Sequence, residues 1–279
     1  MDSKKKPLWL VFDEPQCPES QNITIFKIGD DLRQDILTLQ LLKLMDQIWL
    51  ADGIDLKLTP YEVISTGDQI GMIEVVTNAE TVSKIQIKHG GLATGALKET
   101  TIANFLRENN EDIKDFKKAQ DNFVRSCAGY CVATYALGIG DRHSSNIMVT
   151  KNGFLFHIDF GHFLGNFKTK MGVLRERSPF VFTNEMAFVM GGKKFQSHRL
   201  FNKFKELCNK AFVSLRKNHQ LFVDMLRLVF IFKHLEKMVT SGIPELRSDK
   251  DIEYFTNMLM LDKGEKEATE ELQRIIRET

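Results

Sequence analysis

The chain has 279 residues, of which 43% are hydrophobic and 27% are charged, and its formal net charge is +1. This length suits one large domain or two lobes around a cleft, and the composition is ordinary for a soluble globular protein. The nearly neutral charge argues against bulk electrostatic capture of nucleic acid, so we expect no nucleic-acid partner, and a local basic patch for any anionic ligand.

Four short segments rich in β-forming residues predict strands in the first part of the chain. Residues 8–12 and 23–27 are separated by a stretch with Pro and Ser, which predicts an antiparallel pair. Residues 61–65 and 70–76 are joined by a Thr-Gly-Asp turn. The first 76 residues therefore indicate a small sheet with one helix packed on it.

That helix is predicted between the two pairs of strands. Apolar residues recur at helical spacing from Leu32 to Ile48, with Asp30 or Asp31 available as N-cap and Gly53 as terminator. After residue 76 the chain becomes mostly helical.

A long apolar stripe and a hairpin follow in the middle of the chain. The stripe runs through residues 123–137 and ends at Gly138. An Asn-Gly pair then separates the apolar runs 147–149 and 155–158, which is a strong hairpin signal. The last hundred residues predict amphipathic helices, one of them with a stripe that includes Leu221, Met225 and Leu228 or Val229.

Neither the cysteines nor the apolar runs indicate secretion or a membrane span. Cys127 and Cys131 lie four residues apart in an apolar helical stretch, which predicts a buried helix face instead of a metal site. This usage fits a reducing, intracellular compartment. The longest apolar run near the C-terminus, residues 228–232, is too short to cross a bilayer, and the N-terminus has no signal-peptide pattern.

The most informative stretch follows the apolar stripe. It reads Gly140-Asp141-Arg142-His143-Ser144-Ser145-Asn146, and His157-Ile158-Asp159-Phe160-Gly161-His162 comes after it. Asn and Asp on facing turns suit Mg²⁺, a hard cation that takes oxygen ligands and shares them with phosphates. An Asp five residues before such an Asn, with Asp-Phe-Gly downstream, is the order of a kinase phosphoryl-transfer centre. We therefore expect Asn146 and Asp159 to be the metal ligands.

Three side chains are candidates for contact with the transferred group. Protein kinases read His-Arg-Asp where this chain reads Asp-Arg-His, so Asp141 keeps the spacing of a proton acceptor and His143 is an additional imidazole. A histidine can accept a hydroxyl proton at neutral pH. The sequence leaves the choice between Asp141 and His143 open. His162 directly follows Gly161 and is a third candidate, for contact with the γ-phosphate.

Lys27 ends an apolar strand just before a run of acidic residues. A lysine that faces inward at such a place needs an anionic partner. In a kinase it would bind the α- and β-phosphates of ATP, steadied by a carboxylate from Asp30, Asp31 or Asp35.

Taken together, these motifs resemble the catalytic domain of the phosphoinositide 3-kinases. The motifs are Lys27-Ile28-Gly29-Asp30-Asp31-Leu32-Arg33-Gln34-Asp35, Gly71-Met72-Ile73-Glu74-Val75-Val76, Ser126-Cys127-Ala128-Gly129-Tyr130-Cys131, Gly138-Ile139-Gly140-Asp141-Arg142-His143 and Asp159-Phe160-Gly161-His162. Pro7-Leu8-Trp9-Leu10 and Arg175-Glu176-Arg177 with Pro179 resemble the class I enzymes. The resemblance covers essentially the whole chain. It implies transfer of the ATP γ-phosphoryl group to the 3-hydroxyl of phosphoinositides, with Mg²⁺ and with phosphatidylinositol 4,5-bisphosphate as the expected lipid.

The resemblance also implies roles for individual residues. Nucleotide contacts are implied for Ser3 and Lys5 in a phosphate loop, Lys27 as the ATP lysine, Asp35 and Tyr61 in an inner pocket, Ile73, Glu74 and Val76 in the hinge, and Trp9, Ile25, Met148 and Ile158 around the adenine ring. Backbone groups of Glu74 and Val76 would bind the adenine.

Substrate choice is expected in the segment from Phe160 to Pro179, the activation loop of the family. Its basic residues are Lys168, Lys170, Arg175 and Arg177. Such a cluster offers charge-assisted hydrogen bonds to inositol phosphates and attraction to an anionic membrane surface. Leu174 stands where several class I members have a lysine, which bears on the preference for the bisphosphate.

The fold implied is α+β, a bilobal protein-kinase-like fold with a small antiparallel sheet and a helix in an N-lobe (residues 1–76) and a mostly helical C-lobe (residues 77–279). We expect a catalytic-core fragment that is cytoplasmic and recruited peripherally to membranes, with a regulatory subunit or small GTPase binding to regions outside this chain. The rival hypotheses are a related kinase with another acceptor, such as a phosphatidylinositol 4-kinase or a large Ser/Thr protein kinase, and a non-catalytic nucleotide-binding fragment.

Overall fold

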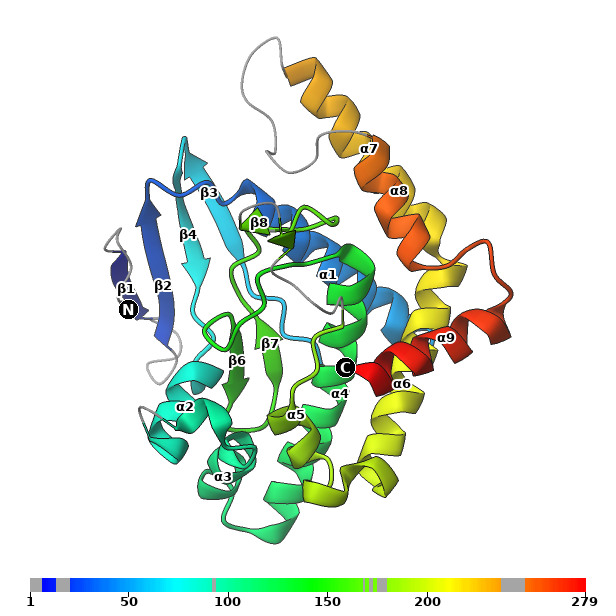
Figure 1. Cartoon of the computed structure of the whole chain (residues 1–279). Coiled ribbons are helices and arrows are strands. Elements are labelled where there is room, and N and C mark those ends of the chain that lie inside the picture. Colours follow the sequence, from blue (N-terminus) through cyan, green and yellow to red (C-terminus); the bar gives the residue numbers. More distant parts are fainter. Residues whose placement is uncertain are drawn as a thin grey trace.

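The computed structural model describes residues 7–13, 21–91, 94–167, 169–170, 173–174, 180–236 and 249–279. Within these residues the chain combines many helices with small antiparallel sheets, which confirms the predicted α+β class. Figure 1 shows the strands of the first sheet on one side of the molecule and the C-terminal helices on the other.

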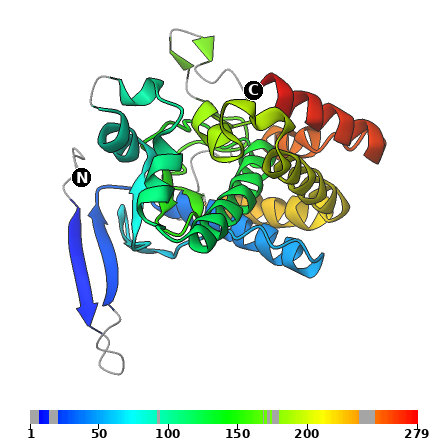
Figure 2. The same cartoon turned by 90° about the horizontal axis from the view of Figure 1, so that it is seen from below.

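A four-stranded antiparallel sheet is built from the N-terminal part of the chain. Across the sheet the order is β1 (Leu8–Asp13), β2 (Gln21–Ile28), β4 (Ile70–Glu74) and β3 (Val63–Gly67). All three contacts between neighbouring strands are antiparallel, so both predicted strand pairs are confirmed. In Figure 2 the β1–β2 pair extends away from the rest of the molecule.

Helix α1 (Arg33–Ala51) confirms the predicted helix but not its N-cap, which is Leu32. Asp31 lies one residue further out, where its carboxylate accepts hydrogen bonds from the backbone N–H of Arg33 at 3.1 Å and from the Arg33 side chain. At the other end of the helix, Trp49 Nε1 donates to the Ala211 carbonyl oxygen at 3.0 Å. This bond anchors α1 to helix α6 (Arg199–Lys217) of the C-terminal half.

A second sheet contains three short strands in the order β5 (Ala79–Thr81), β6 (Ile147–Thr150) and β7 (Leu155–His157). β6 and β7 form the predicted hairpin, whereas β5 was not predicted. The turn requires glycine at position 153, because φ is 88° there and an added Cβ atom would lie 2.0 Å from the Ala119 carbonyl oxygen.

The remaining described elements are mostly helices. They are α2 (Val82–Gly90), a 3₁₀ turn (Gly95–Leu97), α3 (Thr101–Glu108), α4 (Ile113–Leu137), the strand pair β8 (Thr169–Lys170) and β9 (Val173–Leu174), α5 (Asn184–Val189), a 3₁₀ segment (Gly192–Ser197), α6, α7 (His219–Glu236), α8 (Asp249–Met258) and α9 (Glu265–Glu278). Helix α4 ends at Gly138, as predicted, with a left-handed φ of 54°.

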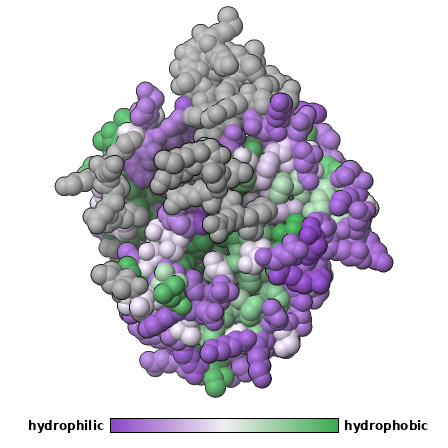
Figure 3. All heavy atoms as spheres, viewed as in Figure 1, coloured by the Kyte–Doolittle hydropathy of each residue, from purple (hydrophilic) through white to green (hydrophobic). Residues whose placement is uncertain are grey.

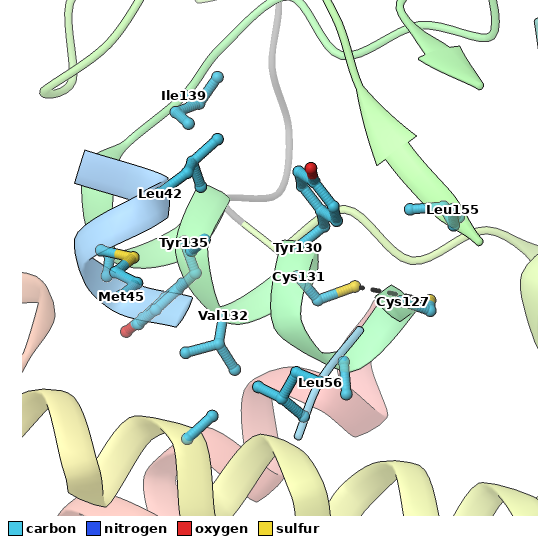
Figure 4. Close-up of a cluster of buried hydrophobic side chains, with 14 of the residues drawn as sticks. Leu42, Met45, Leu56, Cys127, Tyr130, Cys131, Val132, Tyr135, Ile139 and Leu155 are labelled. Atoms are coloured by element: carbon cyan, nitrogen blue, oxygen red, sulfur yellow. Dashed lines mark hydrogen bonds between the residues drawn. The ribbon is translucent and has the colours of Figure 1, made fainter. Parts of the chain in front are cut away.

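One hydrophobic core runs through the described residues and has α4 at its centre. Figure 4 shows part of this core, with Leu42 and Met45 of α1 and Tyr135 of α4 among its buried side chains. Cys127 and Cys131 are both buried, and their sulfur atoms lie 3.9 Å apart. This arrangement confirms the predicted buried helix face.

Helix α7 is amphipathic as predicted, and two positions of the predicted stripe, Met225 and Val229, pack against the core. Phe222, Val223 and Leu226 are buried, whereas Leu221 and Leu228 are half exposed, at 50% and 54%. The prediction is thus confirmed at Met225 and Val229 and wrong at Leu221 and Leu228, because the packed face of α7, which the neighbouring helix α8 adjoins, includes Phe222 and Leu226 instead. Hydrophilic residues predominate over hydrophobic ones on the coloured part of the surface in Figure 3. Among the described helices, none is long and apolar enough to span a membrane.

Candidate active site

Asn146 and Asp159 lie at the same end of the β6–β7 hairpin. The register pairs Ile147 with His157, and one step further the Ile158 N–H donates to the Asn146 carbonyl oxygen at 3.0 Å. The Asn146 side chain is buried, and its Nδ2 donates to the Asp141 carbonyl oxygen at 3.0 Å. That bond fixes the orientation of the carboxamide and leaves its Oδ1 as the atom for a ligand.

The donor set at this end of the hairpin fits a magnesium ion. An amide oxygen and a carboxylate are hard ligands, and Mg²⁺ commonly takes one or two such groups and completes its shell with water and phosphate. Nowhere in the described part of the chain do three or more His, Cys, Asp or Glu side chains form a group able to hold a metal.

Lys27 lies on the face of the first sheet that carries the residues expected around the adenine. Trp9 lies opposite Ile25 in the register of β1 and β2, and Ile25 lies opposite Ile73 in that of β2 and β4. Residues that lie opposite each other share a face, and so do residues two apart in a strand, which places Lys27 beside Ile25 on this face. Trp9 remains 55% exposed there.

The partner of Lys27 is Asp30, at 2.9 Å between Nζ and Oδ2. Of the three predicted carboxylates, Asp31 instead pairs with Arg33. Asp35 accepts a hydrogen bond from the Phe160 N–H at 3.1 Å. The pKa of Asp35 is raised to about 6, mainly by burial and also by the nearby Asp159 carboxylate, while the hydrogen bond from the Phe160 N–H opposes the rise.

Tyr61 and the apolar residues of the second sheet complete this region. Tyr61 is buried with its ring 6.5 Å from that of Phe156, and burial raises its pKa well above the usual value. Met148 on β6 and Ile158 after β7 are partly buried against the core. Because Met148 lies opposite Phe156 and Asn146 opposite Ile158, these residues share one face of the hairpin.

The expected hinge begins at the end of β4. The Glu74 N–H donates to the Glu62 carbonyl oxygen at 2.8 Å, and the Glu62 N–H donates to the Glu74 side chain, Oε2, at 2.7 Å. The Glu74 carboxylate thus accepts the Glu62 N–H, which in a regular antiparallel pair would donate to the Glu74 carbonyl oxygen. The carbonyl oxygen is therefore the backbone atom of Glu74 that suits an adenine amine. Val76 follows and is partly buried.

The hydrogen bonds of His143 and His162 assign different tautomers to their neutral rings. His143 is exposed, and its Nδ1 accepts from the Ser145 N–H at 3.2 Å, so its proton is on Nε2. His162 Nδ1 lies 3.0 Å from the Asn166 carbonyl oxygen, which can only accept. His162 Nδ1 therefore carries a proton, and in the neutral ring Nε2 is the atom that can accept one.

Asp141 adopts a left-handed backbone with φ 58°, at the start of the loop that ends at Asn146. Of the other predicted residues, Ser3, Lys5, Lys168, Arg175 and Arg177 lie outside the described residues. Lys170 belongs to β8, which pairs with β9.

Sequence reasoning missed two residues that hold the site together. Arg142 donates to the carbonyl oxygens of Gly140 and Ile158 at 2.8 Å each and also to that of Asp159. Gln34 of α1 donates to the Phe160 carbonyl oxygen at 2.7 Å. Both residues stand inside motifs that were recognised, but their bonds go to backbone groups far away in the sequence, which no local pattern reveals.

Comparison with known proteins shows the family. The profile of the family described as "Phosphatidylinositol 3- and 4-kinase" matches residues 22–248. The chain belongs to the phosphatidylinositol 3- and 4-kinase family. It is 50% identical over 279 residues to "Phosphatidylinositol 3-kinase 1" of Dictyostelium discoideum, covering 100% of this chain and 17% of that protein.

Two other relatives from Dictyostelium discoideum show the same level of similarity. "Phosphatidylinositol 3-kinase 2" is 50% identical over 278 residues, covering 99% of this chain and 14% of that protein. "Phosphatidylinositol 3-kinase 3" is 50% identical over 281 residues, covering 100% of this chain and 16% of that protein. The chain thus spans about one sixth of the length of these phosphatidylinositol 3- and 4-kinase family members.

Proposed function

We propose that this domain transfers the γ-phosphoryl group of ATP to the 3-hydroxyl of phosphoinositides, with phosphatidylinositol 4,5-bisphosphate as the preferred lipid. The observation that carries the proposal is the joining of Asn146 to the Asp159 loop by the 3.0 Å bond from the Ile158 N–H to the Asn146 carbonyl oxygen. This arrangement offers the two side-chain oxygens that a Mg²⁺ ion shares with ATP phosphates. The names of the relatives supply the class of acceptor.

In this proposal, residues of both sheets would bind the nucleotide. Trp9 and Ile25 would cover one face of the adenine, and Met148 and Ile158 would cover the other. The Glu74 carbonyl oxygen and the Val76 N–H would bind its edge. Lys27 would contact the α- and β-phosphates and Ser3 and Lys5 the outer ones, while Asp35 and Tyr61 line the inner wall. We place the boundary between the two lobes at residue 76.

Metal binding and proton transfer are assigned to residues of the catalytic loop and to Asp159 and His162. Asn146 and Asp159 would hold Mg²⁺, which neutralises charge on the phosphate oxygens during transfer. In the conformation of the structure, the Nε2 atom of His143 can donate but cannot accept a proton. This tautomer supports Asp141 or His162 as the acceptor of the hydroxyl proton, with His143 donating a hydrogen bond to the phosphoryl group.

The basic residues Lys168, Lys170, Arg175 and Arg177 would bind the inositol phosphates at a membrane surface. A regulatory subunit or a small GTPase would act through the parts of the longer relatives that this chain does not cover.

A lipid kinase assay tests the proposal. Phosphatidylinositol and its 4-phosphate and 4,5-bisphosphate are presented separately on anionic vesicles with Mg-ATP, and the products are resolved by ring position. We expect phosphorylation at the 3-position, strongest on the bisphosphate and lost in Asp159→Asn. Phosphorylation at the 4-position, or of protein only, would contradict the proposal.

Two sets of variants assign the roles. Neutral replacements of the four basic residues should abolish lipid phosphorylation while sparing ATP hydrolysis; unchanged lipid turnover would exclude them as the lipid site. Among Asp141→Asn, His143→Ala and His162→Ala, the variant that abolishes turnover while retaining ATP affinity identifies the proton acceptor. Near-full turnover in His143→Ala would show that this imidazole is not the base.

A further inference from the structure

Two consecutive residues of α1 hold both backbone groups of Phe160, the residue after Asp159. Gln34 Nε2 donates to the Phe160 carbonyl oxygen at 2.7 Å, and the Phe160 N–H donates to Asp35 Oδ1 at 3.1 Å. Gln34 is 7% exposed, so its bond is made away from water. A buried bond of this kind is costly to lose, because the carbonyl oxygen would have no solvent to replace its donor.

Arg142 holds the backbone just before Phe160. Its guanidinium donates to the carbonyl oxygens of Ile158 and Asp159 and stands over the Phe160 ring, 5.5 Å from the centroid. The Ile158 N–H is bonded to Asn146. Five backbone groups of residues 158–160 are thus fixed by contacts from other elements.

These contacts hold a backbone conformation that is unfavourable by itself. Asp159 has a left-handed φ of 61°, a conformation that is unfavourable for a residue with a Cβ atom and persists only when the surroundings enforce it. α1 is a firm support, because Trp49 near its other end is fully buried and bonded to α6.

We propose that Gln34 is a positioning residue, whose carboxamide keeps the Asp159 loop in its metal-binding conformation and thereby links the metal affinity of the site to the position of α1. The inference rests on the proposed function in one respect, that Asp159 is a metal ligand. Gln34 is better suited to a test than its neighbours. A change at Asp35 or Arg142 would also affect the site directly, because Asp35 is expected to face the nucleotide and Arg142 adjoins Asp141. The bond from Gln34 acts on Asp159 only through Phe160.

The test compares Gln34→Glu with Gln40→Glu. The first replaces the buried donor by an oxygen that faces the Phe160 carbonyl oxygen, and the second makes the same charge change at an exposed position of α1. Gln34→Met, which removes the donor without adding charge, serves if the Glu variant does not fold.

Two readouts separate positioning from a purely structural role. Without metal or nucleotide, hydrogen exchange of the Phe160 amide should be at least about tenfold faster in the Gln34 variants, the factor expected for loss of one buried hydrogen bond. With a non-hydrolysable ATP analogue, the Mn²⁺ concentration at half-saturation should rise by roughly tenfold, while affinity for the analogue without metal stays within about twofold. The Gln40 variant should match the wild type in both.

The proposal would be overturned if the Gln34 variants showed the same Phe160 hydrogen exchange and the same Mn²⁺ half-saturation as the wild type, even if their thermal stability fell. Failure of the proposed function is distinguishable. Wild-type protein that binds Mn²⁺ with the analogue but phosphorylates no lipid would refute the lipid kinase assignment and leave the two readouts valid. Wild-type protein that binds no Mn²⁺ with the analogue would overturn the positioning role, because there would be no metal site to position.

Discussion

Glu185 accepts a hydrogen bond from Gln86 at 2.8 Å, across 99 positions of the sequence. The same oxygen, Oε1, accepts from the Thr101 hydroxyl at 3.1 Å, and all three side chains are buried. One carboxylate therefore ties α5 to both α2 and α3. We expect Glu185→Ala to lower the free energy of unfolding by about 3 kcal/mol, because two buried donors lose their acceptor.

Urea denaturation measures this loss. The matched control is Glu80→Ala, which removes a partly exposed carboxylate paired with Lys84 at 3.3 Å. Such a surface pair contributes little, so the control should lose less than about 1 kcal/mol. Equal losses in the two variants would show that the buried network around Glu185 does not stabilise the fold.

Gly153 and Gly53 provide a second test, because both have a left-handed φ, of 88° and 74°, but different surroundings. A Cβ atom at position 153 would lie 2.0 Å from the Ala119 carbonyl oxygen, whereas at position 53 it would meet nothing within 4 Å. Gly53→Ala should cost about 1 kcal/mol of unfolding free energy from backbone strain alone. Gly153→Ala should cost about 3 kcal/mol or more, since the hairpin must also move away from α4. Similar losses in thermal or urea unfolding would contradict this reading of the turn.

The elements that could be predicted from the sequence are those with a strong local signal. The Asn-Gly turn defined the β6–β7 hairpin, Gly138 ended α4, and the two N-terminal strand pairs followed from their β-forming residues. The pairing of Asn146 with the Asp159 loop was also foreseeable, because a hairpin brings the two ends of its strands together.

What could not be predicted depends on contacts between distant segments. The three residues of β5 become a strand only because β6 lies beside them. The buried face of α7 depends on what packs against it, so Leu221 and Leu228 were wrongly assigned to it. The tautomers of His143 and His162 depend on the single backbone group that each Nδ1 meets. Local composition carries none of this information.

Arg142 should prove essential to stability as well as to the site. Arg142→Met would leave three carbonyl oxygens, those of Gly140, Ile158 and Asp159, without their donor. We expect a loss of about 3 kcal/mol in the free energy of unfolding, and about half of that for Arg142→Lys, because a single ammonium group cannot replace the guanidinium fork. Urea denaturation of both variants measures the difference.

The control for Arg142 is Arg107, which also stands over a phenylalanine ring, 4.9 Å from the Phe116 centroid, but at an exposed position. Arg107→Lys keeps the charge near the ring and should change the free energy of unfolding by less than about 1 kcal/mol. If Arg142→Lys were as mild as this control, the fork geometry of Arg142 would not be what holds the loop.

His157 makes stability depend on pH in a definite direction. It is buried against the Tyr130 ring, with centroids 5.1 Å apart, and burial together with the charge of Arg142 lowers its pKa well below the ordinary 6.5. Below pH 6.5 the unfolded chain therefore binds a proton at this position that the folded chain does not. Folding stability rises with pH wherever the unfolded state binds more protons, so this histidine destabilises the fold as the pH falls.

His157→Phe keeps an aromatic ring on Tyr130 and removes the titrating group. Between pH 7.5 and pH 5.5 the wild type should lose about 1 kcal/mol more unfolding free energy than this variant, because a shifted group contributes up to about 1.4 kcal/mol per pH unit. Burial also lowers the pKa of His89, so both proteins lose further unfolding free energy through His89 as the pH falls. Comparing the wild type with the variant isolates the contribution of His157. Parallel pH profiles of the two proteins would mean that His157 takes up its proton in the folded state, and that the core around Tyr130 admits a charge.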